Sequence, residues 1–232
     1  MADRHFVKYT FLKVDPAWRR LDSDERVQHK LEFMAACADF ADGHLLQTLS
    51  LVGTRGDAEL LVISEAENLE RIHEFHVVLN QSGLMRWSAI PHSFLGMRKP
   101  SEYTDALAVR PRPFRGKYVL VCPFVKSRRW YGLPGEERQR IMDAHIAVGR
   151  EYAGIDNHTA YSFGLDDQEF VVAFDTDDVA TFLDLAQRLR TTEAAAYTER
   201  ETPTFTCLVT SPARALGALD GQPLPAEVYP GA

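Results

Sequence analysis

Cysteine is scarce in this chain, and its scarcity excludes the scaffolds that depend on it. Cys37, Cys122 and Cys207 are the three cysteines in 232 residues, and they lie far apart with no CxxC pair. An odd number of widely separated cysteines argues against a disulfide framework and against a zinc site. We therefore expect a reducing, cytoplasmic environment.

Long apolar runs and an excess of positive charge are also missing. No apolar run approaches the roughly 18 residues that a membrane helix needs, and charges interrupt the N-terminal stretch MADRHFVKYTFLKVDP. We therefore expect neither a membrane span nor a signal peptide. The formal net charge of -7 argues against nucleic-acid binding, which normally needs a basic face. The 45% hydrophobic and 25% charged residues are those of an ordinary globular protein with room for two domains of about 110 residues.

The chain contains two copies of one sequence unit. WRRLDSDERVQHKLEF begins at Trp18, and WYGLPGEERQRIMDAH begins 112 residues later, at Trp130. LVGTRGDAELLVI (51–63) and SFGLDDQEFVVAF (162–174) repeat at a similar offset. In each copy a helical segment follows, and a short extended run, HSFLGMRK or PTFTCLVT, closes the unit. Such self-similarity indicates a duplicated fold.

Each unit has the order strand, helix, strand, strand, helix, strand. HFVKYTFLKV and KYVLVCPFV are apolar and β-branched, as first strands are, and the Gly- and Asp-rich GTRGDAEL and GLDDQEF are hairpin turns. The βαββαβ order is the ferredoxin-like motif. We expect an α+β protein in which two tandem ferredoxin-like units (1–108 and 118–232) form a pseudo-symmetric dimeric α+β barrel. The linker VRPRPFRGK (109–117) is either a solvated connector or a basic segment that grips an anion.

One histidine has no counterpart in the other copy. His145 corresponds to Phe33 at the 112-residue offset, and on a helix over 134–152 it lies in one stripe with Ile141 and Val148. The residues alone leave two interpretations: a core histidine bonded to a backbone carbonyl, or an axial ligand of a metal or heme. His73 and His76 form an HxxH without an acidic or cysteine partner at metal spacing, which favours a structural role.

The stretches PFVKSRRWY, MDAHIAVGR, TAYSFGLDDQEFVVAFDTDD and TPTFTC resemble the chlorite dismutase family, which includes the peroxide-dependent coproheme decarboxylases, also called heme synthases. The resemblance covers nearly the whole chain and is densest from Lys117 to Cys207. It implies a homo-oligomer, commonly a pentamer, and a heme (heme b or coproheme) in the C-terminal unit. It also implies that His145 is the proximal ligand of the heme iron.

Further site residues follow from the resemblance. Lys126 and Arg150 match positions near the heme propionates, where cations pair with carboxylates, although solvated surface charge is the alternative for both. Trp130 matches an aromatic residue near the heme, but Trp18 in the other copy shows that core packing explains it as well. Glu193 matches an acidic residue that accepts a hydrogen bond from the proximal imidazole in some members, and a helix-surface glutamate is the alternative.

The distal position implied by the resemblance lies thirteen residues after His145 and holds His158. Chlorite dismutases have arginine there, and many coproheme decarboxylases have glutamine or another polar residue. The absence of arginine argues against chlorite dismutation. A histidine there suits proton transfer with bound hydrogen peroxide near neutral pH. The alternative is a loop histidine that points to solvent.

The remaining feature is a substitution within the motif. Coproheme decarboxylases have Tyr-Pro-(Phe or Met)-x-Lys, whose tyrosine initiates decarboxylation, and here Cys122 precedes Pro123 in its place. Tyr118 shares the strand face but lies about 13 Å away, too far to replace it well. We expect a heme-dependent, peroxide-using oxidoreductase of coproheme decarboxylase type with Cys122 at the catalytic position. The alternatives are a heme b enzyme that oxidises another small molecule and a non-catalytic heme carrier or sensor in which Cys122 is a buried apolar residue.

Overall fold

The computed structural model describes residues 4–104 and 112–224. The first unit consists of β1 (His5–Val14), a 3-10 helix (Pro16–Arg20), α1 (Ser23–Ala41), β2 (Leu45–Ser50), β3 (Leu60–Ala66), α2 (Leu69–Leu79), α3 (Gly83–Arg86) and β4 (Ser88–Arg98). The second consists of β5 (Tyr118–Lys126), α4 (Arg128–Tyr131), α5 (Gly135–Arg150), β6 (Ile155–Tyr161), β7 (Phe170–Thr176), α6 (Val179–Arg190), a 3-10 helix (Glu193–Tyr197), β8 (Thr198–Arg200) and β9 (Phe205–Val209), followed by α7 (Pro212–Gly217). The predicted βαββαβ order is present in both copies.

The strands of the two units form one closed sheet. Over the described residues the strand order is β7-β6-β4-β1-β3-β2-β9-β5-β8, and β7 also pairs with β5, which closes a barrel. The order β4-β1-β3-β2 in the first unit recurs in the second as β9-β5-β7-β6, which is the ferredoxin-like arrangement. The two units join where β2 pairs with β9 and where β4 pairs with β6. These equivalent seams give the barrel the pseudo-symmetry that the repeat predicts.

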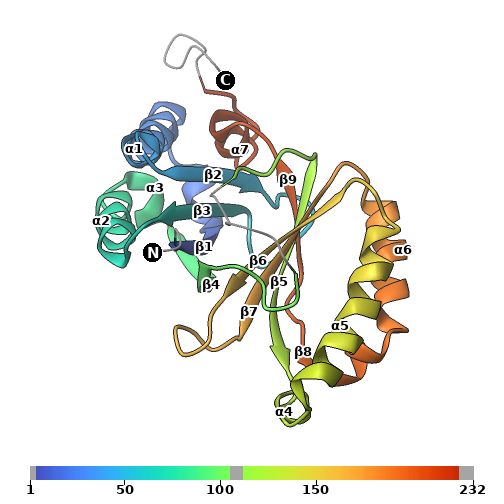
Figure 1. Ribbon diagram of the computed structural model, residues 1–232. Coiled ribbons are helices and arrows are strands. Elements are labelled where there is room, and N and C mark those ends of the chain that lie inside the picture. The colour runs from blue at the N-terminus through green and yellow to red at the C-terminus, as the bar shows by residue number, and fades with distance from the viewer. Residues whose placement is uncertain (1–3, 105–111, 225–232) are drawn as a thin grey trace.

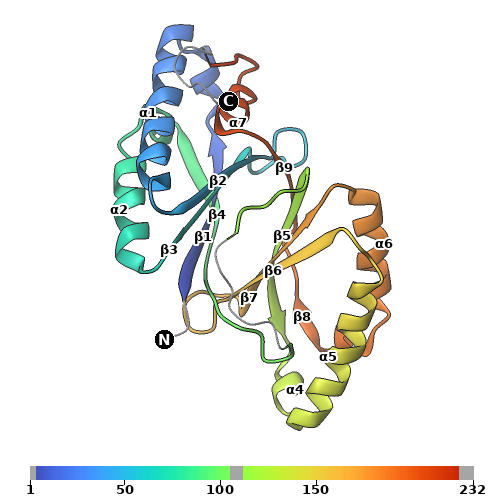
Figure 2. The same cartoon turned by 45° about the horizontal axis from the view of Figure 1, so that its top comes forward.

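One hydrophobic core fills the barrel, because alternate residues of each strand point inward. Its members include Val7, Tyr9 and Phe11 of β1, Leu61 and Ile63 of β3, Val119 and Val121 of β5, Val171 and Ala173 of β7, and Phe205 and Cys207 of β9. The other face of each strand points to the helices. In Figure 1, α1 and α2 cover one side of the barrel, and α5 and α6 cover the opposite side; the turned view of Figure 2 shows the same arrangement.

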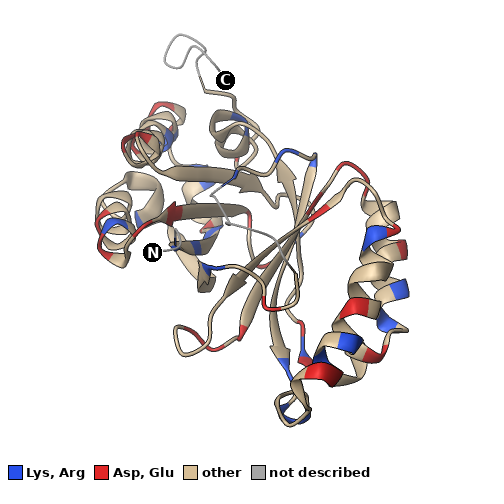
Figure 3. Ribbon diagram, viewed as in Figure 1, with Lys and Arg blue, Asp and Glu red and all other residues tan. Residues whose placement is uncertain are grey.

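Local sequence signals set where the helices begin. The Asp22 carboxylate accepts the backbone N–H of Asp24 at the start of α1, and Asp178 accepts that of Ala180 at the start of α6. α5 follows Pro134 and carries Glu136 and Glu137 in its first turn, where acidic side chains suit the helix dipole. Figure 3 shows charged residues of both signs along α5 and α6, whereas the central strands are largely uncharged.

The end of the described chain packs on the N-terminal unit. α7 contacts α1 and β2, and its Ala215 and Leu216 belong to the same hydrophobic cluster as Phe33. Asp220 accepts hydrogen bonds from Lys30 (2.5 Å) and Arg26 (2.9 Å). The predicted boundary assigns residues 118–232 to the C-terminal unit. Within that range, however, α7 and Asp220 pack on the first unit, beside α1 in Figure 1.

The described part of the predicted linker packs against the barrel and is hydrogen-bonded to both units. Phe114 is buried in the barrel core, and its backbone exchanges two hydrogen bonds with the Gln47 side chain. The Asp175 carboxylate accepts the backbone N–H groups of Arg115 and Gly116. A Cβ at Gly116 would come within 2.6 Å of Asp175, so glycine permits this close approach. Residues 109–111 of the predicted linker lie outside the described ranges.

Candidate functional site

The two units differ in the space between their helices and the sheet. In the N-terminal unit large side chains fill this space: Trp18, Phe33, Met34, Phe40, Ile72, Phe75, Leu79 and Leu84. In the C-terminal unit the corresponding region is part of a cavity of about 1930 Å³, which also reaches residues of the first unit such as Phe6 and Met97. Its lining includes Cys122, Phe124 and Lys126 of β5, His145 of α5 and Phe182 of α6. Packing in folded proteins leaves few voids larger than a water molecule, so a hollow of this size marks a binding site.

His145 lies on the cavity-facing side of α5. Arg138, Met142, His145 and Gly149 line the cavity and follow the spacing i, i+4, i+7, i+11 of one helix face. The predicted stripe differs in detail: Ile141 is buried between α5 and its neighbours, and His145 faces the hollow where Phe33 fills the other unit. Burial, followed by the charge of Lys126, lowers the pKa of His145 below its usual value. The imidazole is therefore neutral at neutral pH, the form that binds metals.

Thr192 orients the His145 ring. The Thr192 hydroxyl donates its proton to the Leu189 carbonyl oxygen at 2.7 Å, so toward the imidazole it can only accept. His145 Nδ1 lies 3.1 Å from that hydroxyl oxygen and therefore carries the proton. Nε2 keeps its lone pair. The sequence did not indicate a role for Thr192, because it is an ordinary threonine one position before the acidic residue that the family pattern indicates.

The prediction for Glu193 is corrected. Its carboxylate accepts a hydrogen bond from Arg140 at 2.7 Å on the exposed surface of α5. Glu193 is the first residue of a 3-10 helix, and this places its side chain outside while Thr192 points to His145. The partner of His145 Nδ1 is therefore a neutral hydroxyl, and no carboxylate of residues 4–104 or 112–224 is bonded to this imidazole.

Lys126 and Trp130 form one packed unit beside the cavity. Lys126 is 9% exposed, its Nζ donates to the Ala194 carbonyl oxygen at 3.1 Å, and it lies 4.7 Å from the Trp130 ring centroid. Burial lowers the pKa of Lys126 to about 8, so the ammonium is still mostly protonated at pH 7. Trp130 is buried against Tyr103 and Tyr197. Both predicted residues border the cavity, and Trp130 also serves core packing, as Trp18 does.

Arg150 ends α5 at the cavity rim with an exposed side chain. The ammonium of Lys126 and the guanidinium of Arg150 thus border one hollow. These are the charges that would pair with carboxylates of a bound molecule.

Cys122 borders the cavity as a protonated thiol. Burial, assisted by the nearby Glu201 carboxylate and opposed by Arg190, raises the pKa of Cys122 to about 12. Glu201 and Arg190 form an ion pair with each other. A thiol of this pKa is a poor nucleophile at neutral pH. Tyr118 shares the strand face but is not among the residues that line the cavity in the described chain.

The side chain of His158 points to the barrel-core face of β6, although a distal position opposite His145 was predicted. His158 pairs with Ala173 of β7, whose side chain lies in the barrel core, and its ring packs on Phe114, 4.6 Å between centroids. Asn157 and Thr159, its neighbours on β6, pair with Phe174 and Val172. Phe174 packs on Phe182 of α6, so these neighbours face the helices.

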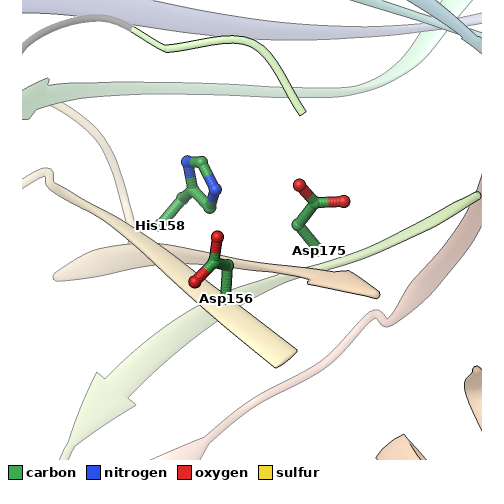
Figure 4. Close-up of side chains that lie close together, drawn as sticks. All are labelled: Asp156, His158 and Asp175. Atoms are coloured by element: carbon green, nitrogen blue, oxygen red, sulfur yellow. The ribbon is translucent and has the colours of Figure 1, made fainter. Parts of the chain in front are cut away.

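The predicted distal role of His158 is thus not supported by its direction, because adjacent residues of a strand point to opposite faces. It borders an extension of the cavity at the barrel mouth, where it lies close to Asp156 and Asp175 (Figure 4). Burial and the charges of Arg112 and Arg98 lower the pKa of His158 to about 4. This imidazole is neutral at pH 7, and it does not face His145.

His73 and His76 belong to α2 and form no metal cluster with other described side chains. His76 lies 3.4 Å from the Thr10 hydroxyl, and burial lowers its pKa to about 4. A structural role for both histidines stays a prediction. No helix in the described ranges is long and apolar enough to cross a membrane.

Comparison with known proteins agrees with the fold. A family model described as chlorite dismutase matches residues 16–210. The chain belongs to the chlorite dismutase family. A curated relative, the coproheme decarboxylase of Mycolicibacterium smegmatis, is 32% identical over 161 residues, which cover 67% of this chain and 69% of that protein.

Two solved structures of the same fold illustrate the match. A chlorite dismutase variant from Candidatus Nitrospira defluvii superposes with a TM-score of 0.87 at 20% identity, over 94% of this chain and 96% of that one. A heme-binding protein from Thermus thermophilus superposes with a TM-score of 0.82 at 25% identity, over 95% and 96%. The predicted family and the predicted fold are confirmed.

Several other cavity residues were given no role from the sequence. Tyr103, Tyr131, Tyr152 and Tyr161 all line the hollow. Burial raises the pKa of Tyr131, and the hydrogen bond that its hydroxyl donates to Glu169 at 2.6 Å raises it further. Tyr131 and Tyr161 stand in stretches that resemble the family, but the sequence did not show that these four tyrosines meet, because they come from separate segments that the fold brings together.

Proposed function

We propose that this protein binds heme in the C-terminal cavity through His145 and acts as a peroxide-dependent heme oxidoreductase of coproheme decarboxylase type. The observation that carries the proposal is the difference between the two units. The same helix-to-sheet space is filled around Phe33 and hollow around His145. The names of two relatives, a coproheme decarboxylase and a heme-binding protein, support the same cofactor.

The residues present fit a heme. The hollow is larger than the roughly 300–1,000 Å³ of pockets for drug-sized ligands. It offers one neutral imidazole whose Nδ1–H is held by Thr192, which leaves Nε2 free to ligate iron. Lys126 and Arg150 provide positive charge that would pair with heme propionates. Heme b and coproheme differ in the number of propionates. Trp130 would hold the Lys126 stem in place.

When bound, the heme would supply one-electron and two-electron oxidation driven by hydrogen peroxide. The protein would bind and orient it. His145 would hold the iron, Phe124 and Phe182 would exclude water, and Lys126 would pair with a carboxylate. With Thr192 as its partner, the imidazole keeps its Nδ1 proton rather than sharing it with a carboxylate, which leaves the ligand neutral.

Cys122 determines whether the oxidation is decarboxylation of coproheme. A protonated thiol with a pKa of about 12 stands where the decarboxylases carry a phenol. In a decarboxylation each propionate releases CO₂ and becomes a vinyl group, losing two electrons, and one hydrogen peroxide is reduced to water. Electrons would have to pass through Cys122 or through another cavity side chain such as Tyr161.

The test is reconstitution of the heme-free protein with coproheme, followed by titration with hydrogen peroxide and mass measurement of the porphyrin. Loss of two carboxyl groups supports the decarboxylase. Bleaching without mass loss refutes that reaction. Cys122→Ser is the matched variant, because it keeps the volume but cannot be oxidised as a thiol. Cys122→Tyr restores the family pattern and is expected to raise the decarboxylation rate. If His145→Ala leaves the Soret band unchanged, the heme assignment itself is wrong.

A second candidate is a non-catalytic heme carrier or sensor. The direction of His158 favours it, since this histidine does not face His145 and so cannot serve as a distal acid or base. A carrier would bind heme b tightly and reversibly, without decarboxylation and without turnover of a peroxidase dye. Dye turnover by the heme b form would instead support oxidation of another small molecule.

The proposal includes a homo-oligomer, expected to be a pentamer, in the cytoplasm. The outer face of α2 exposes Leu69, Val77 and Val78, and exposed apolar side chains grouped on one element are typical of contact surfaces. Light scattering after size exclusion measures the subunit number, and a monomer at micromolar concentration would refute the oligomer.

A further inference from the structure

Three potential metal ligands meet at the mouth of the barrel, on the face of the sheet opposite to His145. Asp156 of β6 pairs with Asp175 of β7, and His158 lies two residues further along β6. Their side chains point to the same face, because alternate residues of paired strands do. One ligand atom from each lies within 4.8 Å of the other two. In Figure 4 the His158 ring turns one nitrogen toward the two carboxylates.

The His158 nitrogen lacks a partner. His158 is 3% exposed, and its Nε2 has no hydrogen-bond partner among the described residues. Leaving a buried polar atom unpaired costs about 1–3 kcal/mol, and such atoms in folded proteins usually have a partner, an ordered water or an ion. This atom is aimed at two carboxylates, which is the environment of a metal ligand.

The two carboxylates retain oxygen lone pairs for an ion. Each oxygen of Asp175 accepts one backbone N–H, from Arg115 or Gly116 at 2.8 Å, which leaves a second lone pair on each. Asp156 is paired with Arg112 at 3.1 Å, and both side chains are more than half exposed. An exposed ion pair contributes about 0–1 kcal/mol, so a metal ion can displace Arg112.

The charges around the cluster also allow a cation. Arg98, the other guanidinium that acts on His158, is bound by both oxygens of Glu65 at 2.9 and 2.8 Å, so that pair is neutral. Arg112 compensates one of the two aspartates, and the other leaves a net negative charge.

We propose that Asp156, His158 and Asp175 bind a divalent transition-metal ion such as Zn²⁺, at a site separate from the His145 cavity face. An imidazole with two carboxylates suits Zn²⁺, Co²⁺ or Mn²⁺ better than Ca²⁺ or Mg²⁺, which take oxygen ligands. With bonds of about 2.1 Å, tetrahedral ligand atoms lie about 3.4 Å apart. The exposed Asp156 can move the short distance that this requires. Water would complete the coordination.

Metal binding at this site would tie three segments together. Asp156 and His158 lie on β6, Asp175 lies on β7, and Asp175 also holds the backbone of residues 115–116. An ion bound only by the folded chain stabilises it, and the stabilisation grows with the logarithm of the ion concentration once that exceeds the dissociation constant. The site therefore gives a structural metal that secures the connector between units to the second unit, independently of heme.

The experiment is titration of the full-length, heme-free His145→Ala protein with Zn²⁺ by calorimetry, and with Co²⁺ by visible absorption. The His145→Ala background removes the competing imidazole of the cavity. One ion per chain is expected, with a rise in unfolding temperature and a Co²⁺ spectrum typical of nitrogen and oxygen ligands. His158→Gln and Asp156→Asn should each weaken binding at least tenfold, whereas His76→Gln, which changes a histidine of α2, should not.

Zn²⁺ binding that is unchanged in both His158→Gln and Asp156→Asn would overturn the proposal. So would absence of stoichiometric binding at millimolar Zn²⁺. Asp156 is exposed, so Asp156→Asn is expected to fold even if His158→Gln does not, and circular dichroism checks each variant.

Discussion

At the scale of single residues, one hydroxyl decides which nitrogen of His145 faces the cavity. Thr192 gives its proton to Leu189 and can only accept from the ring. The carboxylate that the family pattern indicated, Glu193, is bonded to Arg140 on the surface. The orientation of the candidate iron ligand therefore depends on a neutral residue, and its electronic effect is correspondingly mild.

Thr192→Val should release the His145 ring. Valine has a similar shape but cannot accept the Nδ1–H, so the ring is expected to populate both tautomers and to bind heme about 10-fold more weakly. Long-range ¹H–¹⁵N NMR of the heme-free protein reports the tautomer, and a Soret titration reports the affinity. Thr192→Ser keeps the hydroxyl and should behave as the unchanged protein. A valine variant with one tautomer and full affinity would contradict the assignment.

The Cys122 thiol should resist alkylation at ordinary pH. With its pKa raised to about 12, the thiol stays protonated below that pH, and its thiolate fraction at pH 8 is about 1,000-fold below that of a cysteine of ordinary pKa. The iodoacetamide rate at Cys122, followed by peptide mass spectrometry, should still rise at pH 10. Unfolding in urea should restore ordinary reactivity. A plateau near pH 9 in the folded protein would show that the thiolate is stabilised.

At the scale of elements, α7 and the residues after it connect the chain end to the first unit through a buried ion cluster. The Lys30 side chain has no solvent exposure, and its ammonium is bound by Asp220 and by the Gln222 carbonyl oxygen. Arg26 binds the other oxygen of Asp220. Breaking a buried pair costs more than the pair contributes, because the remaining charge has no partner.

Asp220→Ala should therefore destabilise the protein by about 3–5 kcal/mol, measured by urea unfolding. Lys30→Met in the same background should recover part of that loss, since it removes the unpaired ammonium. The control is Glu137→Ala, which breaks an exposed pair with Arg140 and is expected to lower the free energy of unfolding far less, because both side chains are solvated. Equal effects of Asp220→Ala and Glu137→Ala would mean that the chain end does not contribute to stability.

At the scale of the whole molecule, two copies of one fold differ in how fully they are packed. The first unit fills its helix-to-sheet space around Phe33, and the second leaves it open around His145. A protein with one filled and one hollow unit gains stability mainly from the filled one and offers the hollow one to a ligand. The closed barrel, with its continuous core, holds the two units together.

Truncation at these matched positions should have unequal costs. Phe33→Ala in the heme-free protein is expected to lose about 3–5 kcal/mol of stability, because it opens a cavity in a filled core. His145→Ala borders an existing hollow and loses one hydrogen bond, so about 1 kcal/mol is expected. Heme should raise the unfolding temperature of the unchanged protein and of Phe33→Ala, but not of His145→Ala. Similar costs for the two truncations would contradict the difference between the units.

Prediction from sequence succeeded where the pattern is local or repeated. The strand and helix order follows from hydrophobic periodicity and turn residues, and the duplication supplies each element assignment twice. The 112-residue offset set His145 against Phe33, and the structure shows a hollow beside the first and a filled core around the second. His158 and Glu193 were placed wrongly because each lies one position from the residue that faces the site. A shift of one residue reverses the direction of a side chain on a strand, and it turns that direction by about 120° in a 3-10 helix.

The sequence by itself therefore determined the two ferredoxin-like units, their family and the histidine that distinguishes them, because these depend on residue types at regular spacing. The tertiary structure alone decided that Thr192 orients His145, that burial raises the pKa of Cys122 and keeps its thiol protonated, and that His158 lies close to Asp156 and Asp175. These features depend on distances between segments far apart in the chain and on how much of each side chain is buried. The spacing of residues in the sequence encodes neither. Cys122 shows both parts: the motif marks it as unusual, and the surrounding fold sets its pKa.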